Sequence, residues 1–209
     1  MHKSNYIGIV LEELYRIFSI LNKDYYNNQL PEPIITIQKG KSRNNLGWFS
    51  LDPIWINEND ENNKHEINIS AEHLNRNMYD IVGTIHHEMV HYQNKLNNIK
   101  DVNNNRHNKK FKSLAEEKDL IVKNHKSYGW GITEPSEKLK KYIDEVIKPV
   151  KECFLYFRQI TTNKKNKREK KIFKYICPKC GEVAKAKLDV DIVCGKCDCK
   201  FEFSDERPS

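Results

Sequence analysis

The sequence predicts an α+β protein that ends in a small cysteine-rich module. Apolar residues recur at helical spacing over residues 7–25, which predicts an amphipathic helix. Short runs that alternate apolar and polar residues lie between 31 and 70, and they predict a small sheet. Five of the six cysteines fall within the 23 residues from Cys177 to Cys199. At 209 residues the chain is long enough for one core plus such a module.

The elements of the N-terminal half follow from these patterns in order. The residues after the first helix contain a Pro-bounded turn, then apolar runs, a polar stretch and the alternating run His65–Ser70. We expect a helix over 7–25, strands within 31–40 and within 44–56, a loop over 57–64, a third strand over 65–70, a short helix over 71–75 capped by Ser70, and a longer helix over 78–97.

The C-terminal half is predicted to be mainly helical before the cysteines begin. We expect a loop over 97–106, a helix over 107–122, a Gly- and Pro-containing break over 127–136, and a helix over 137–150 that Pro149 ends. These elements suggest a main domain over 1–135, a helix and basic linker over 136–175, and a zinc-binding module over 176–203, for the reasons given below.

Charge is distributed unevenly along the chain, whose formal net charge is +7. Residues 151–209 carry 15 Lys and Arg against 9 Asp and Glu, whereas residues 1–150 carry 21 against 20. A basic segment indicates an acidic partner, most often a nucleic acid, although composition alone equally fits a solvated linker. No apolar run approaches the roughly 20 residues that span a bilayer, and acidic residues interrupt the first helix. We therefore expect a cytoplasmic protein without membrane association.

The stretch GTIHHEMVHYQN lies on the predicted helix over 78–97. His87 and His91 are four residues apart, so they share one face of the helix, whereas His86 points well away from them. His87-Glu88-Met89-Val90-His91 is an H-E-x-x-H motif, in which two histidines bind zinc and the glutamate accepts a proton from a water that the metal activates. We assign Glu88 as the catalytic base and His86 as a surface or supporting residue.

The remaining apolar residues of this helix support a one-sided arrangement. They recur at spacings of four, four, three and four, and the centre of their stripe lies about 140° from the two histidines on an ideal helix. One side of the helix can therefore pack into a core while the other faces a cleft. The stripe consists of Ile81, Ile85, Met89, Tyr92 and Leu96.

A catalytic zinc site needs a third protein ligand and an open position. His107, His125, Glu116 and Glu117 are the downstream candidates. His107 follows His91 by 16 residues, enough chain to turn back, and it starts the next predicted helix. A glutamate from that helix is the rival geometry, and the pattern alone divides these alternatives about evenly.

The C-terminal cysteines have the spacing of a four-cysteine zinc ribbon. Cys177-x-x-Cys180 and Cys194-x-x-Cys197 are separated by 13 residues, and each pair is accompanied by a glycine that permits a tight turn. Cys199 is an alternative to Cys197, and the remaining cysteine, Cys153, is expected to be buried as an apolar residue. A zinc ion closed off by four thiolates has no open position, so its role is structural or in binding.

Basic residues and aromatic residues surround this predicted ribbon. Such a combination suits single-stranded nucleic acid, whereas the simpler interpretation is a solvated linker and a hairpin core. The basic residues are Lys164, Lys165, Lys167, Arg168, Lys170, Lys171 and Lys174, and the aromatic ones are Phe173, Tyr175, Phe201 and Phe203.

The stretches TIHHEMVHYQN and RHNKKFKSLAEEKDL, with the cysteine pairs, resemble the SprT-like family of zinc metallopeptidases, which includes the Spartan-type DNA–protein crosslink proteases. In that family a later helix opens with the third histidine and has an aromatic residue four positions on, as His107 and Phe111 do here. The chain departs from the pattern at Asn108, where glycine is frequent. The resemblance implies a zincin-like metallopeptidase core over a helix, a small sheet and the H-E-x-x-H helix, with His87, His91 and His107 as ligands and Glu116 as the main rival.

The function expected from this resemblance is zinc-dependent peptide-bond hydrolysis. One catalytic and one structural zinc ion are implied, with a protein substrate that is DNA-associated or DNA-crosslinked, and with single-stranded or damaged DNA as a partner of the ribbon. The segment around Trp48 and Phe49 is a candidate edge strand for an extended peptide, although both side chains are better explained as core, as is Tyr128, a possible oxyanion donor. The alternative function is a non-proteolytic, zinc-containing nucleic-acid-binding or transcription-associated factor.

Overall fold

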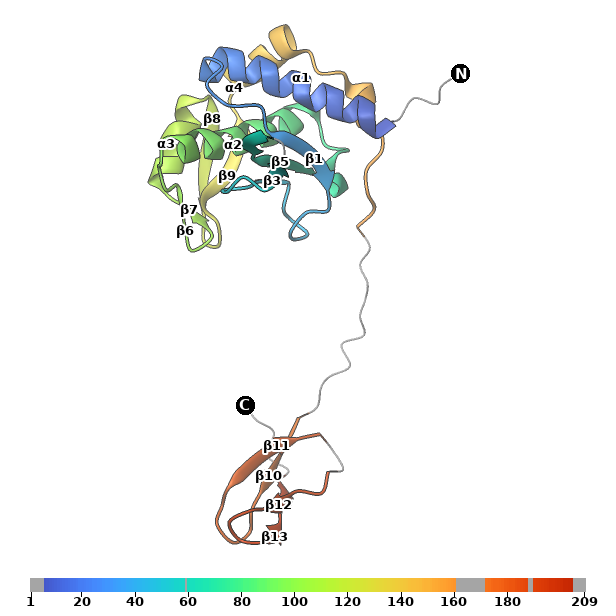
Figure 1. The fold of residues 1–209 in the computed structure, drawn as a ribbon, viewed down its shortest axis with the longest axis vertical. Coiled ribbons are helices and arrows are strands. Elements are labelled where there is room, and N and C mark those ends of the chain that lie inside the picture. The colour runs from blue at the N-terminus through green and yellow to red at the C-terminus, as the bar shows by residue number, and fades with distance from the viewer. Residues whose placement is uncertain (1–5, 59, 161–171, 188–189, 205–209) are drawn as a thin grey trace. The chain divides into compact units, whose positions relative to one another are not determined.

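The computed structural model describes residues 6–58, 60–160, 172–187 and 190–204, with the backbone alone for 60–62. The chain divides into two compact units, Met1–Ile160 and Thr161–Ser209, which are considered separately here (Figure 1). Both helices and strands are present, as the predicted α+β class requires. Among the described residues, no helix is long and apolar enough to cross a membrane.

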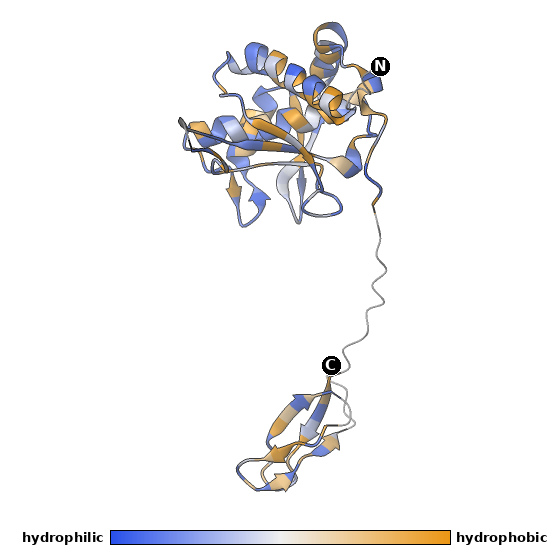
Figure 2. Ribbon diagram, turned by 45° about the vertical axis from the view of Figure 1, so that its right-hand side comes forward, coloured by the Kyte–Doolittle hydropathy of each residue, from blue (hydrophilic) through white to orange (hydrophobic). Residues whose placement is uncertain are grey.

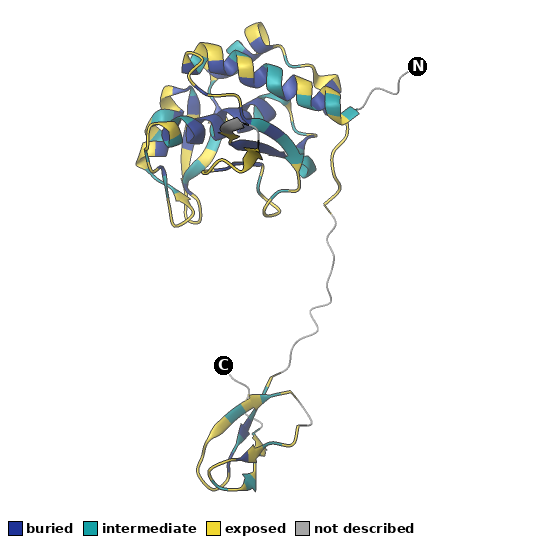
Figure 3. Ribbon diagram, in the orientation of Figure 1, coloured by how far each residue is buried: buried dark blue, intermediate teal, exposed yellow. Residues whose placement is uncertain are grey.

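Helices of the N-terminal unit surround one central helix, α2, which contains the H-E-x-x-H motif. α2 contacts α1, α3, β2, β5 and β9 (Figure 1), and most of its length is buried (Figure 3). α1 alternates between hydrophilic and hydrophobic residues along its length (Figure 2), and its buried side faces α2 and β1. The helical elements are α1 (Tyr6–Tyr26), the 3-10 turn η1 (Ala71–His73), α2 (Met78–Leu96), α3 (Lys109–Glu117), α4 (Glu137–Tyr142), the π-helical η2 (Ile143–Ile147) and the 3-10 turn η3 (Lys151–Phe154).

A three-stranded sheet packs beneath α2 in the order β1–β5–β2. β1 (Ile34–Gln38) runs parallel to β5 (Glu66–Ser70), and β2 (Gly47–Phe49) runs antiparallel to it. All five residues of β5 are buried. The buried carboxylate of Glu66 is compensated by hydrogen bonds from the Thr36 hydroxyl at 2.6 Å and from the Trp55 indole at 2.6 Å. Because β5 lies between the other two strands, β2 forms one edge of this sheet, next to α2.

A second sheet has the order β6–β7–β9–β8 and lies on the α3 side of α2. β7 pairs in parallel with β9 through His107 and Gly129, and β8 pairs antiparallel with β9. The strands are β6 (Val102–Asn103), β7 (Arg106–His107), β8 (Leu120–His125) and β9 (Gly129–Pro135).

Several sequence predictions require correction in these regions. The predicted loop over 57–64 contains β4 (Asp60–Lys64), which pairs with β3 (Trp55–Asn57), so the expected strand within 44–56 is split into β2 and β3. The helix predicted over 107–122 ends at Glu117, because Asp119 adopts φ +62° and the chain continues as β8. The strand β6 lies within the predicted loop over 97–106, and the strand β9 lies within the predicted break over 127–136. Apolar residues such as Leu120 and Val122 fit a helix or a strand, and tertiary pairing decides between them.

The C-terminal end of the first unit returns to α1. The Tyr6 hydroxyl donates to the Cys153 carbonyl at 2.7 Å, and the Glu13 carboxylate accepts from the Val150 backbone at 2.9 Å and from Arg16. Cys153 is 9% exposed, which confirms the prediction of a buried thiol. The division into 1–135, 136–175 and 176–203 stays a prediction, although residues up to 160 group with the first unit.

The second unit is a set of short antiparallel strands. β10 (Phe173–Ile176) pairs with β11 (Val183–Ala186) and with β14 (Glu202–Ser204), while β12 (Val193–Cys194) pairs with β13 (Cys199–Lys200). Tyr175 is 6% exposed, and with the buried Cys177 and Cys194 it forms the small core, while the half-exposed ring of Phe203 packs against its edge.

Replacing Ile69 by alanine tests the role of the central strand. Ile69 is fully buried in β5, so Ile69→Ala is expected to lower the free energy of unfolding by about 2–5 kcal/mol through lost burial and cavity formation. The control is Ile56→Ala, because Ile56 is 75% exposed and should change stability by no more than about 0.5 kcal/mol. Urea denaturation followed by tryptophan fluorescence measures both, and equal effects would contradict this assignment of the core.

Candidate metal centre

α2 places two histidines side by side on the face that turns away from its apolar stripe. Asn77 caps the helix by accepting a hydrogen bond from the Asp80 backbone at 2.8 Å, which fixes where the helix begins. His87 and His91 follow one turn apart, with ring centroids separated by 5.0 Å. Ile81, Ile85 and Met89 on the other face are fully buried, as the helical pattern predicts.

His107 brings the third imidazole to the same point from β7. Its Nε2 lies 3.2 Å from Nε2 of His87 and 3.0 Å from Nε2 of His91. Four ligands at about 2.0–2.1 Å from a tetrahedral zinc ion stand about 3.3–3.4 Å from one another. The three nitrogens therefore converge with nearly the spacing that one zinc ion requires, and this histidine triad could bind zinc.

The ring of Phe111 supports all three imidazoles. Its centroid lies 4.7 Å from His87, 4.6 Å from His91 and 4.5 Å from His107, and the side chain is fully buried. Phe111 lies in the first turn of α3, which Asn108 caps by accepting hydrogen bonds from Lys110 and Phe111. The Asn108 side chain thus has a defined structural role at the position where the resemblance expects glycine.

Each histidine uses its other ring nitrogen to contact an oxygen. Nδ1 of His91 donates to the Asp101 carboxylate at 2.7 Å, and Nδ1 of His107 donates to the Tyr128 carbonyl at 3.2 Å. Nδ1 of His87 lies 2.8 Å from the Thr133 hydroxyl. Such contacts fix the ring orientation and leave Nε2 free for a metal, which is the usual second layer of a histidine site.

The surroundings favour neutral imidazoles. Burial and the neighbouring histidines lower the pKa of His87 well below its usual value, and burial followed by the charge of His91 lowers the pKa of His107 to about 4. Burial alone would raise the pKa of Asp101, but hydrogen bonds from His91 and Asn94 hold it below its usual range. Neutral nitrogen donors beside a carboxylate anion are the form that binds a cation.

Glu88 points from the same helix toward strand β2. It is 5% exposed, and its carboxylate accepts a hydrogen bond from the Phe49 backbone N–H. Burial raises the pKa of Glu88 to about 7, and this effect exceeds the opposing influence of His91 and Lys41. A carboxylate whose pKa lies near neutrality can both accept and return a proton, as general acid–base catalysis requires.

Two glycines make room for His107. A Cβ on Gly131 would lie 2.3 Å from Nδ1 of His107, and a Cβ on Gly129 would lie 2.3 Å from the His107 carbonyl oxygen. Gly129 also has φ +61°, a conformation that other residues rarely adopt. Only glycine therefore permits β9 to pass this close to β7.

The sequence was compared with models of known protein families, and one family model matches it. The model of the SprT-like family matches residues 14–126, more than half of the chain. The chain belongs to the SprT-like family. No curated protein and no solved structure matches the chain. The matched SprT-like residues contain the three histidines and Glu88 but not the cysteine pairs, and membership is consistent with a metallopeptidase-like role.

The SprT-like fold separates the rival ligands from the histidine triad. Glu116 is exposed and lies 3.6 Å from Lys112, Glu117 pairs with Lys118, and His125 is exposed with its ring stacked on Tyr128. Tyr128 is 46% exposed, so the prediction of a core role for its side chain is wrong; its backbone carbonyl contacts His107 instead.

Of the two alternatives for His86, the surface position is wrong. His86 is fully buried rather than on the surface, and its Nε2 donates to the Lys118 carbonyl at 2.7 Å while Nδ1 lies 3.3 Å from the Tyr26 hydroxyl. Burial lowers the pKa of His86 to about 4. This histidine therefore connects α2 to α1 and to the end of α3. It can do so because it points away from the face of α2 that carries His87 and His91.

Sequence reasoning missed the residues that hold the triad in place. Asp101 and Thr133 contact the ligand rings, and Gly131 provides space for one of them, yet none belongs to the H-E-x-x-H motif. Asp101 lies ten residues after His91 in an Asn-rich segment, and two closely spaced glycines follow Tyr128. The paired glycines were the available signal, because such spacing indicates a close backbone approach.

In the second unit of this SprT-like protein, the sulfur atoms of four cysteines lie close together. The Sγ atoms of Cys177, Cys180, Cys194 and Cys197 all lie within 4.8 Å of one another, so this cluster could bind zinc. Gly181 has φ +72° in the turn after the first pair, as a tight turn requires. Cys199 lies opposite Cys194 in the β12–β13 pair and 3.5 Å from the Cys177 sulfur, so the alternative to Cys197 stays open.

Replacing Gly131 by alanine tests the architecture of the triad. The added Cβ would collide with Nδ1 of His107, so Gly131→Ala is expected to weaken zinc binding at the histidines at least about 10-fold. Ser113→Ala is the control, because it places alanine at an exposed position of α3 and changes neither β9 nor the cysteine cluster. Competition with a chromophoric chelator measures the affinity. Unchanged binding in Gly131→Ala would refute the predicted collision.

Proposed function

We propose that this protein is a zinc-dependent metallopeptidase of the H-E-x-x-H type with a zincin-like core. The observation that carries the proposal is the convergence of Nε2 of His87, His91 and His107, with the Glu88 carboxylate on the same helix beside them. Three histidines leave one position of a tetrahedral site open, which distinguishes a catalytic site from a structural one. A purely structural site would need no buried glutamate next to its ligands.

The chemistry divides between the bound ion and the chain. Zinc supplies Lewis acidity, which polarises a carbonyl and promotes ionisation of water. Glu88 accepts the proton of the attacking water and returns it to the leaving amine. The Phe49 N–H holds the Glu88 carboxylate in place during this exchange, and Asp101 fixes the orientation of the His91 ring through Nδ1.

The substrate is proposed to pair with β2 as an additional strand. The backbone N–H of Ser50 donates to the Glu66 carbonyl, and the backbone N–H of Ser70 donates to the Leu46 carbonyl. The backbones of Leu46 and Ser50 are therefore hydrogen-bonded to β5. In an antiparallel pair the intervening residues, Gly47 and Phe49, direct their backbone groups to the opposite edge, which faces Glu88. An extended peptide bound there would lie beside the histidine triad. Phe49 is buried, as predicted, and Trp48 is half-buried beneath Lys41.

A second zinc ion is proposed for Cys177, Cys180, Cys194 and Cys197. The unit that carries them has a small core, so metal binding would supply much of its folding free energy. The full chain would then contain one catalytic and one structural zinc ion, in the main domain and in the ribbon.

Nucleic acid is the proposed partner of the C-terminal region, and DNA-associated or DNA-crosslinked proteins are the proposed substrates. Support comes from the charge of residues 151–209 and from the SprT-like family, part of which acts on such substrates. The run from Lys164 to Lys171 lies outside the described residues. Of the aromatic residues, Phe203 is 46% exposed and available for stacking, whereas Tyr175 is buried.

Replacing Glu88 by glutamine tests the catalytic assignment. Glu88→Gln keeps the shape of the side chain but removes the base, so peptide cleavage should fall by at least about 100-fold while zinc content stays at the wild-type value. Glu116→Gln is the matched control, because it makes the same change on an exposed surface. Cleavage of a DNA-binding protein and metal analysis are measured together. Undiminished cleavage by Glu88→Gln would exclude it as the base.

Neutralising the basic linker tests the partner. Replacing Lys164, Lys165, Lys170 and Lys171 by glutamine should weaken binding to single-stranded DNA and lower the slope of log affinity against log salt by up to about 2.8, at about 0.7 per phosphate contact. Glutamine at the four lysines of α1 and α4, Lys23, Lys138, Lys140 and Lys141, provides the control. Fluorescence anisotropy across a salt series measures both. A slope equal to that of the wild type would contradict a role for this segment.

A further inference from the structure

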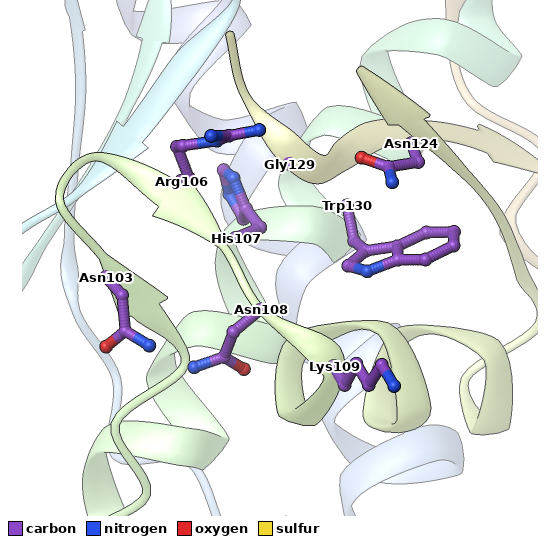
Figure 4. A pocket seen from close by; sticks show the side chains of 8 residues that line it. All are labelled: Asn103, Arg106, His107, Asn108, Lys109, Asn124, Gly129 and Trp130. Atoms are coloured by element: carbon purple, nitrogen blue, oxygen red, sulfur yellow. The ribbon is translucent and has the colours of Figure 1, made fainter. Parts of the chain in front are cut away.

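A cavity of about 330 Å³ lies beside the histidine triad on the outer side of His107. It opens between the β6–β7 turn, the start of α3 and the β8–β9 hairpin (Figure 4). His107 belongs to both sites, since its Nε2 faces the other histidines while its ring lines the cavity. We call this cavity the Trp130 pocket, and its lining residues are Asn103, Arg106, His107, Asn108, Lys109, Asn124, Gly129 and Trp130.

The charge of the Trp130 pocket is entirely positive. Its lining contains two cations and no carboxylate. Arg106 and Lys109 are exposed, and within the described part of the chain no salt bridge joins either one to an acidic residue. A third cation is near the pocket, because the ammonium of Lys112 lies 4.2 Å from the centre of the Trp130 ring. Unpaired cations at the mouth of a cavity favour an anionic ligand.

The other groups of the pocket favour a planar ligand with hydrogen-bonding edges. Trp130 forms one wall, opposite Arg106 and His107 in Figure 4. The side chains of Asn103 and Asn124 supply amide donors and acceptors around it, whereas the Asn108 amide already caps α3 and donates to the Lys100 carbonyl. The next residues of the same hairpin, His125 and Tyr128, form an exposed stacked pair with centroids 4.9 Å apart. Cations interleaved with aromatic rings and amides are typical of single-stranded nucleic-acid sites.

We propose that the Trp130 pocket binds one nucleotide of a single-stranded nucleic acid, with its base against Trp130 and its two flanking phosphates at Arg106 and Lys109, which lie at opposite ends of the pocket in Figure 4. The proposal rests on the proposed association with nucleic acid and adds a contact within the N-terminal unit itself. An acidic peptide side chain would use the two cations but would leave the indole and the amides of Asn103 and Asn124 without a role. The nucleotide accounts for all of these groups.

The position of the pocket has a consequence for the substrate. Because His107 lines the pocket and also belongs to the triad, a bound nucleotide would lie one side chain away from the candidate catalytic centre. A protein attached to that nucleotide or to its neighbour would therefore stand at the cleft. Binding of the nucleic acid and presentation of the peptide would then occur on one surface.

The first experiment removes the two cations from the full zinc-loaded chain. Arg106→Ala with Lys109→Ala should weaken binding of a fluorescent oligodeoxythymidylate about 10-fold or more at 0.1 M salt, and lower the salt slope by about 1.4. Lys138→Ala with Lys141→Ala is the control, because it removes two charges from α4, away from the pocket, and should alter binding little. Zinc content is measured in parallel, since Arg106 adjoins His107. Equal affinities in the two double variants would overturn the proposal.

The second experiment needs no variant and therefore holds even if the substitutions disturb folding. The wild-type chain is photocrosslinked to an oligodeoxythymidylate that carries one 5-iododeoxyuridine, and the attached residue is mapped by mass spectrometry. Crosslinks at Trp130, or at Tyr128 beside it, support the proposal. Crosslinks confined to residues 172–204 overturn it but leave the proposed protease and its C-terminal DNA contact intact.

A third readout distinguishes a peptide site from a nucleotide site. Cleavage of acidic and neutral peptides is compared for the Arg106/Lys109 double variant in the absence of DNA. A selective loss with the acidic peptide, together with unchanged oligonucleotide binding, would assign the pocket to peptide recognition and overturn the nucleotide proposal. Loss of activity in Glu88→Gln tests the protease separately.

Discussion

The ring of Phe111 is fully buried and lies within 4.7 Å of the centre of each imidazole of the histidine triad. Two of these imidazoles come from α2 and one from β7, so a single apolar side chain of α3 aligns ligands from separate elements. The rest of the site depends on this packing, because Nε2 atoms about 3 Å apart tolerate little movement of any ring. α2 can present its histidines to Phe111 only because its opposite face is anchored in the core by Ile81, Ile85 and Met89.

The two candidate zinc sites differ in their donor atoms and in their surroundings. In the first, Asp101, Thr133 and a backbone carbonyl orient the three imidazoles, and the buried Glu88 lies on the same helix as two of them. In the second, four thiols surround one point and leave no position for a substrate. The basic Trp130 pocket adjoins the first site, because His107 belongs to both. The proposed hydrolysis, peptide pairing and nucleotide binding would therefore share one surface of the N-terminal unit.

Much of the fold could be predicted from local sequence. The helical pattern of residues 7–25 corresponds to α1, and Pro149 ends the helical stretch that begins with α4 and continues as η2. The second sheet could not be predicted, because the apolar residues of β8 also fit a helix and because β7 is very short and pairs with a strand that is distant in sequence. β7 has two residues, and it is fixed by pairing with Gly129, 22 positions after His107. A pattern within neighbouring residues does not indicate a pairing over this distance. The local sequence therefore predicts a helix over 107–122 and a break over 127–136.

For the site, the sequence by itself determined which face of α2 carries the ligands, since the period of a helix separates His87 and His91 from His86. The spacing of the cysteine pairs likewise determined that they come together. The convergence of His107 rather than Glu116 with His87 and His91, the burial of His86 and the contacts of Asp101 and Gly131 with the triad exist only in the tertiary structure. Each depends on how separate elements approach one another, and the decisive distance, 2.3 Å from a Cβ at Gly131 to His107, exists only after β9 has packed beside β7.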